Sequence, residues 1–191
     1  MSENIPQWMS TALQGITAWI DYHRAYYSNG NIPEHSIVEE FCALLNAKLP
    51  KDYRIEKEYA YTKLGVAKEK KRADIVIFDK EAKIVKYVFE VKRDSKPCVI
   101  KDDLGRLACV KKANPGVCTF SLIITERRRP KEIVSEKGVA QNSKALKSIK
   151  ALQCFDFSVP KVCKTIHASR FNDNQKNLET ANYACAIEIF G

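Results

Sequence analysis

A nearly continuous apolar run from Val117 to Thr125, VCTFSLIIT, limits the folds open to this chain more than any other feature. Strands with one face in solvent alternate apolar and polar residues, whereas strands covered on both faces are apolar almost throughout. The run therefore predicts a central strand in a sheet that carries packed layers on both faces.

Helical and extended segments alternate around this strand. Pro50 ends a helical segment, and the turn SNGNIP separates that segment from the one before it. The expected helices are Pro6–Tyr27, Glu34–Leu49, Lys101–Ala113 and a shorter one near Asn142–Leu152; a strand is expected at Tyr53–Tyr61 and two or three short strands in the tail. Strands interleaved with helices predict an α/β fold with a central mixed sheet flanked by helices.

Two apolar arms around a polar turn predict a β-hairpin. The arms are DIVIF at Asp74–Phe78 and IVKYVFEVK at Ile84–Lys92, and the turn is DKEAK at Asp79–Lys83. Side chains alternate between the two faces of a strand, so Glu90 and Lys92 point the same way. A turn centred near Ala82 pairs Phe78 with Lys86, Val76 with Val88 and Asp74 with Glu90. Two carboxylates are therefore expected to face each other beside a lysine.

Such a trio has a specific chemical use. Opposed carboxylates repel each other, and burial among apolar neighbours raises their pKa, but a divalent cation removes the conflict. Mg²⁺ takes oxygen ligands and keeps several waters, so Asp74, Glu90, the backbone carbonyl of Val91 and a substrate phosphate make a reasonable site. Lys92 can hold and help deprotonate an attacking water and balance charge on phosphorus. These groups meet the needs of phosphodiester hydrolysis; the alternative is a solvated strand face with an ordinary ion pair.

The segments ADIVIF at Ala73–Phe78 and FEVKR at Phe89–Arg93 resemble the signature hairpin of the PD-(D/E)xK, or restriction-endonuclease-like, nuclease superfamily. The resemblance covers about twenty residues, together with a helix before the hairpin and a helix and strand after it. One position departs from the motif, because Ala73 stands where the motif has proline.

The resemblance implies an αβββαβ core and a metal-dependent endonuclease that hydrolyses DNA, or occasionally RNA, with Mg²⁺ as cofactor and Mn²⁺ as a substitute. Asp74 and Glu90 would be metal ligands and Lys92 would lie at the water. It also suggests a homodimer. We expect one nuclease domain over residues 1–191, with a helical part (1–50), a catalytic core (53–125) and a carboxy-terminal helix and strands (126–191).

Many members of the superfamily add a glutamate from the helix before the hairpin. Here Glu39 and Glu40 both lie in SIVEEFCALLNAKL. Glu40 borders the apolar stripe of this helix, whereas Glu39 points more nearly toward solvent, so Glu40 is favoured as the additional site residue. The alternative is that Glu40 is an ordinary flanking surface residue.

Basic residues flank the hairpin and are expected to contact nucleic-acid phosphates or to form a solvated surface. They are Lys70, Lys71, Arg72, Arg93, Arg127, Arg128 and Arg129. The whole chain carries 32 Lys and Arg against 23 Asp and Glu, a net charge of +9, which favours a polyanionic partner.

Other classes of function have little support in the sequence. No apolar run is long enough to span a bilayer, and the first residues, MSENIPQWMS, do not resemble a secretory signal, so a cytoplasmic location without membrane contact is expected. No phosphate loop or nucleophilic dyad is found. Two alternatives stay open beside a restriction, repair or junction nuclease: a nucleic-acid-binding module that does not cut, and an interaction protein with an acidic partner.

Overall fold

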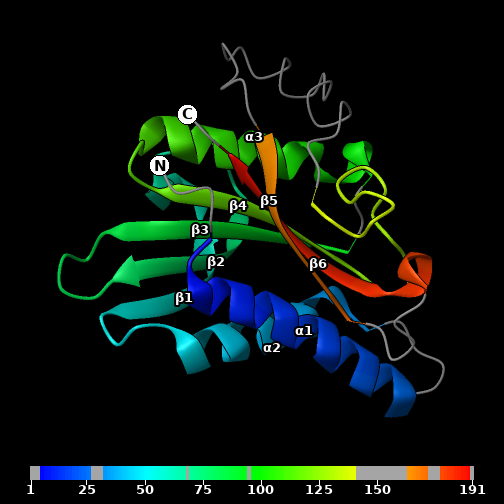
Figure 1. Cartoon of the computed structure of the whole chain (residues 1–191). Helices are drawn as coiled ribbons and strands as arrows, with labels where there is room; N and C mark the ends of the chain where they lie inside the picture. Colours follow the sequence, from blue (N-terminus) through cyan, green and yellow to red (C-terminus); the bar gives the residue numbers. More distant parts are fainter. Residues whose placement is uncertain are drawn as a thin grey trace.

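A six-stranded sheet forms the centre of the molecule, with strand order β1-β2-β3-β4-β6-β5 (Figure 1). The computed structural model describes residues 5–26, 32–67, 69–93, 96–140, 163–171 and 177–189. Its elements are α1 (Gln7–Tyr26), α2 (Glu34–Lys48), β1 (Tyr53–Ala60), the 3-10 helix η1 (Tyr61–Leu64), β2 (Arg72–Asp79), β3 (Val85–Lys92), α3 (Pro97–Ala113), β4 (Cys118–Thr125), β5 (Cys163–Phe171), the 3-10 helix η3 (Leu178–Thr180) and β6 (Asn182–Ile189).

The sheet is mixed, as expected. β3 and β4 are parallel, and every other neighbouring pair is antiparallel. Parallel neighbours need a crossover, and α3 supplies it between β3 and β4. From α2 to β4 the helices and strands follow one another in the order α-β-β-β-α-β.

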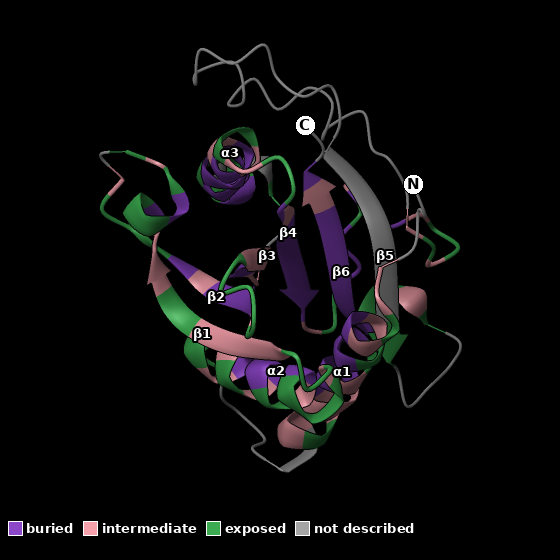
Figure 2. Ribbon diagram, turned by 90° about the vertical axis from the view of Figure 1, so that its left-hand side faces the viewer, coloured by how far each residue is buried: buried purple, intermediate pink, exposed green. Residues whose placement is uncertain are grey.

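Helices cover both faces of the sheet (Figures 1 and 2). One apolar core joins α1 and α2 to the face that carries Ile75, Phe89 and Leu122. A second core joins α3 to the opposite face. The prediction of a central strand is confirmed, because every residue of β4 after Cys118 is buried. Among the described residues, no helix is both long and apolar enough to cross a membrane.

Most element boundaries fall within a residue or two of the sequence expectations, with two differences. α3 begins at Pro97, four residues before the expected Lys101, since proline is well tolerated in the first turn of a helix. The strands of the tail, β5 and β6, have 9 and 8 residues and are not short. The helix expected near Asn142–Leu152 lies outside the described residues.

The hairpin of β2 and β3 follows the predicted register only in part. Val76 pairs with Val88 as predicted, and Ile75 pairs with Phe89, so Asp74 and Glu90 occupy the next position of the same register. The predicted pairing of Phe78 with Lys86 is wrong, because a bulge after Ile77 brings Phe78 opposite Val85. The register places the start of β2 and the ends of β3 and β4 at one end of the sheet.

Candidate active site

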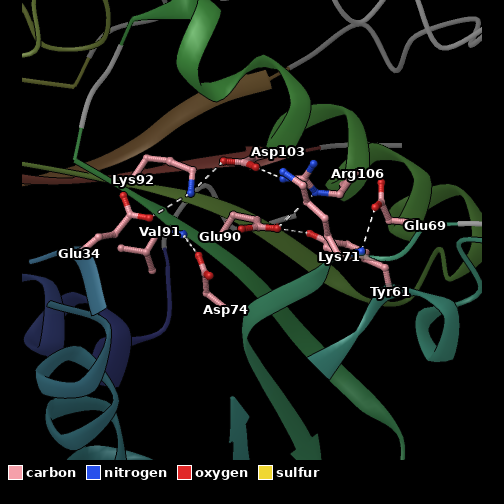
Figure 3. A network of polar contacts seen from close by, with 10 residues as sticks. All are labelled: Glu34, Tyr61, Glu69, Lys71, Asp74, Glu90, Val91, Lys92, Asp103 and Arg106. Atoms are coloured by element: carbon pink, nitrogen blue, oxygen red, sulfur yellow. Dashed lines mark hydrogen bonds and ion pairs between the residues drawn. The ribbon is translucent and has the colours of Figure 1, made fainter. Parts of the chain in front are cut away.

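Asp74, Glu90 and Lys92 lie where β2 begins and β3 ends. Glu90 and Lys92 follow Val88 at two-residue intervals, and Val88 belongs to the core beneath α3, so the strand period turns both side chains toward α3. The intervening Phe89 and Val91 belong to the core beneath α1 and α2. The structure therefore brings the three predicted residues together at one end of the sheet, on the face that α3 covers (Figure 3).

Asp74 is half-buried and is tied to the neighbouring strand. The backbone N–H of Val91 donates a hydrogen bond of 2.7 Å to its Oδ2 atom. This bond fixes the Asp74 carboxylate beside the Glu90–Lys92 segment. β1 is distorted opposite this position, because Glu58 takes a positive φ of 51° and leaves the β1–β2 pairing between Lys57 and Tyr59.

Glu90 is 2% exposed and is the most deeply buried acid of the site. Its Oε1 atom accepts a hydrogen bond of 2.5 Å from the Tyr61 hydroxyl and lies 3.5 Å from Nε of Arg106. Burial, followed by the charges of Asp74 and Asp103, raises the pKa of Glu90 to about 8, although Tyr61 and Arg106 act in the opposite direction. Burial also raises the pKa of Tyr61, so this hydroxyl remains a donor.

Lys92 is held between two acids from different helices. Its Nζ atom lies 3.2 Å from Oε1 of Glu34 in α2 and 3.4 Å from Oδ2 of Asp103 in α3. Burial alone would lower the pKa of Lys92, but the charges of Asp103, Glu34 and Asp74 outweigh it and raise the pKa above its ordinary value. Lys92 is therefore an ammonium group at neutral pH.

α3 contributes Asp103 and Arg106, which form an ion pair one helical turn apart. A continuous chain of polar contacts thus runs from Glu34 through Lys92, Asp103, Arg106 and Glu90 to Tyr61 (Figure 3). The sequence prediction missed both residues of α3. A signal was present, because at about 100° per residue Asp103 falls between the buried Leu107 and Val110 on the helix surface.

The glutamate of α2 that reaches the site is Glu34, which the sequence prediction did not name. Glu40 is half-buried six residues later, about 9 Å along the helix and turned by about 120°. No contact with the site is found for it among the described residues, so its membership stays a prediction. Glu39 points to solvent as expected and pairs with Lys57.

The site offers oxygen ligands for a hard cation, although no group of three or more His, Cys, Asp or Glu in the described part of the chain is arranged to hold a metal. The contacts found there use Oδ2 of Asp74 and Oε1 of Glu90. No contact is found for the second oxygen of either carboxylate among the described residues. Two such oxygens fit Mg²⁺, which keeps several waters in its shell.

Most of the predicted phosphate-binding residues are exposed and form two sets, one at the start of β2 and one after β4. Lys70, Lys71 and Arg72 are exposed, as are Arg127 and Arg128. Arg72 begins β2 and Arg127 follows β4, so both sets of exposed cations lie at the end of the sheet that carries Asp74 and Lys92.

Arg93 and Arg129 are committed to internal contacts. Arg129 is 6% exposed; its Nε donates to Oε1 of Glu179 at 2.7 Å and its Nη1 to the carbonyl of Val134 at 2.9 Å. The prediction that Arg129 contacts phosphates is therefore replaced by a structural role. Arg93 pairs with Glu126, whose buried carboxylate also pairs with Arg24 of α1 at 3.0 Å.

Comparison with known proteins adds one distant likeness. No protein-family model matches the sequence, and no curated protein matches it. The fold is similar to part of NucC from P. aeruginosa ATCC27853 in its cAAA-bound form, with 15% identity and a TM-score of 0.37. The match covers 57% of this chain and 52% of NucC, about half of its length. The likeness concerns part of the fold, and the chemistry rests on the geometry of the site itself.

Proposed function

We propose that this protein is a metal-dependent nuclease that hydrolyses phosphodiester bonds in DNA. The observation that carries the proposal is the meeting of Asp74, the buried Glu90 and the ammonium of Lys92 at one end of the sheet. Burial of ionisable groups that repel each other lowers stability, and such groups with strongly shifted pKa values are concentrated at functional sites.

Each residue has a distinct role in this proposal. Asp74, fixed by the Val91 N–H, and Glu90, fixed by Tyr61, would hold Mg²⁺ or Mn²⁺ through their second oxygens, together with the Val91 carbonyl. The cation would supply positive charge against the attacked phosphate. Lys92 is protonated, so it orients the attacking water and offsets charge developing on phosphorus; its raised pKa makes it a poor base.

The exposed cations at the same end of the sheet would hold the substrate. Lys70, Lys71 and Arg72 enter β2 immediately before Asp74, and Arg127 and Arg128 follow β4. Contacts of this kind go to phosphates, so they place the backbone without reading sequence. The net charge of +9 supports association with a polyanion.

The test is cleavage of supercoiled plasmid and of short single-stranded and branched DNA, in Mg²⁺, in Mn²⁺ and in EDTA. We expect cutting by the wild type only with a divalent cation, and at least about a hundredfold loss in Asp74→Ala and Lys92→Ala. The control Glu179→Gln also removes an acid, from an ion pair outside the site, and should cut normally. Wild-type protein that never cuts, or cutting that survives both substitutions, would refute the proposal.

A second function has an observation in its favour. The Glu90 carboxyl is already bonded to Tyr61, and its pKa of about 8 leaves it mostly protonated at pH 7 without a cation. These features suit a nucleic-acid-binding protein that keeps the arrangement but does not cut. DNA binding in EDTA, without cleavage in either metal and unchanged by Asp74→Ala, would identify this function.

A further inference from the structure

The two residues of α3 in the polar chain, named here the Asp103–Arg106 pair, are buried and charged. Asp103 is 3% exposed and Arg106 is 8% exposed. Arg106 Nη2 donates to Oδ1 of Asp103, and the guanidinium lies 5.7 Å from the centre of the Tyr61 ring. Neither residue belongs to the predicted trio of Asp74, Glu90 and Lys92.

Each member of the pair extends to a different member of the trio. Asp103 Oδ2 lies 3.4 Å from Nζ of Lys92, and Arg106 Nε lies 3.5 Å from Oε1 of Glu90. These two atoms, Oδ2 and Nε, are buried, and apart from these long ion-pair contacts they have no hydrogen-bond partner among the described residues. Buried polar atoms are almost always hydrogen-bonded, and leaving one without a partner lowers stability. Two such atoms, both aimed at the trio, point to a role other than stability.

We infer that the Asp103–Arg106 pair positions the reacting groups, with Asp103 fixing the Lys92 ammonium and Arg106 fixing the Glu90 carboxylate. The inference rests on the proposed nuclease function. Both residues sit on one rigid helix whose turn sets their spacing, so the pair holds Lys92 and Glu90 at a constant separation. Asp103 and Arg106 are positioning residues, because each acts through a member of the trio.

An Arg106 side chain that merely adds positive charge would behave differently from one that positions the Glu90 carboxylate. If Arg106 acts only by its charge, Arg106→Lys preserves its effect, and removing the charge strengthens the binding of a divalent cation. If Arg106 orients Glu90 through its planar, forked donors, lysine cannot replace it. Loss of a residue that orients a metal ligand commonly weakens binding or activity by about 10- to 100-fold.

The first measurement is calorimetric titration of each variant with Mn²⁺ alone, without DNA. We expect the Mn²⁺ Kd to rise about tenfold in Arg106→Lys and in the double variant Asp103→Asn/Arg106→Met, and to change by less than about twofold in Asp103→Asn. The double variant leaves neither member of the pair charged without the other and so guards against a folding defect. Wild-type protein that binds no Mn²⁺, or an Arg106→Lys variant with wild-type affinity, overturns the inference.

The second measurement is cleavage of supercoiled plasmid at saturating Mn²⁺. Asp103→Asn should lower kcat about tenfold with little change in KM, because the ammonium is displaced while DNA contacts remain, and Asp103→Glu should restore part of the rate. Glu179→Gln, which removes an acid from buried Arg129, is the matched control. Equal rates in Asp103→Asn and the control overturn the inference. A wild type that binds Mn²⁺ but does not cut refutes the nuclease function, and the Mn²⁺ titration then decides the inference separately.

Discussion

A carboxyl group as buried as that of Glu90 couples folding stability to pH. Burial, with the charges of Asp74 and Asp103, raises its pKa from 4.5 to about 8, so the folded protein keeps a proton that the unfolded chain has lost. This stabilising contribution is complete below about pH 4.5 and is lost as the pH rises through about 8. The slope in that interval is at most about 1.4 kcal/mol per pH unit.

Glu90→Gln isolates this effect, because the amide resembles the protonated carboxyl and does not titrate. In EDTA, we expect its free energy of unfolding to rise relative to wild type between about pH 5 and about pH 8. In Mg²⁺, where the wild type should cut, we expect cleavage by the variant to be abolished. Urea denaturation at several pH values measures the difference. Parallel pH profiles for the two proteins would show that Glu90 has an ordinary pKa.

Single residues also show where sequence reasoning succeeds. Alternation along β3 was sufficient to place Glu90 and Lys92 on one face, because the strand period is local. Tyr61 lies 29 positions from its partner Glu90, and Glu34 lies 58 positions from its partner Lys92. Both were missed because a local sequence pattern does not relate residues that are so far apart. The run Arg127–Arg129 contains no sign that its last residue is buried, since its partner Glu179 is 50 positions away.

At the scale of elements, Glu126 ties the ends of β3 and β4 to α1. Its carboxylate is 6% exposed and pairs with Arg24 and Arg93, the latter immediately after Lys92. Glu126→Gln should lower the free energy of unfolding by about 1–3 kcal/mol, because two partly buried arginines lose their counter-charge. Chemical denaturation measures this loss. Glu39→Gln, at an exposed pair with Lys57, should stay within about 0.5 kcal/mol of wild type, and an equal loss there would contradict the argument.

The elements themselves were largely predictable, because apolar periodicity is a local property. The apolar run at Val117–Thr125 identified β4, and the two arms around Asp79–Lys83 identified the hairpin. The bulge after Ile77 was not foreseen, because the simple symmetric turn pairs Phe78 with Lys86 equally well. Register in such a turn depends on backbone hydrogen bonds, here from Glu81 and Ala82 to the Asp79 side chain.

At the scale of the whole molecule, the exposed cations on either side of the site should govern DNA affinity. Replacing Lys70 and Lys71, or Arg127 and Arg128, with glutamine should weaken binding about equally for all sequences, because these residues would contact phosphates. The slope of log Kd against log salt should fall by about one for each contact removed. Fluorescence anisotropy in EDTA measures both quantities.

The control for this prediction is Lys83→Gln. Lys83 is exposed in the β2–β3 turn, at the opposite end of the sheet from Asp74. Replacing Lys83 changes the net charge of the protein but leaves Lys70, Lys71, Arg127 and Arg128 in place. A reduction of the salt slope as large as that of the other variants would show that binding follows net charge alone.

The role proposed for Lys92 is tested by Mg²⁺-dependent cleavage of supercoiled plasmid by Lys92→Gln beside Lys86→Gln. Both lysines belong to β3, but Lys86 lies at the irregularity near the start of the strand and pairs with Asp79 only at 3.9 Å. We expect Lys92→Gln to lose at least about a hundredfold in rate and Lys86→Gln to cut as the wild type does. Equal activity in the two variants, or no cutting by the wild type, would contradict it.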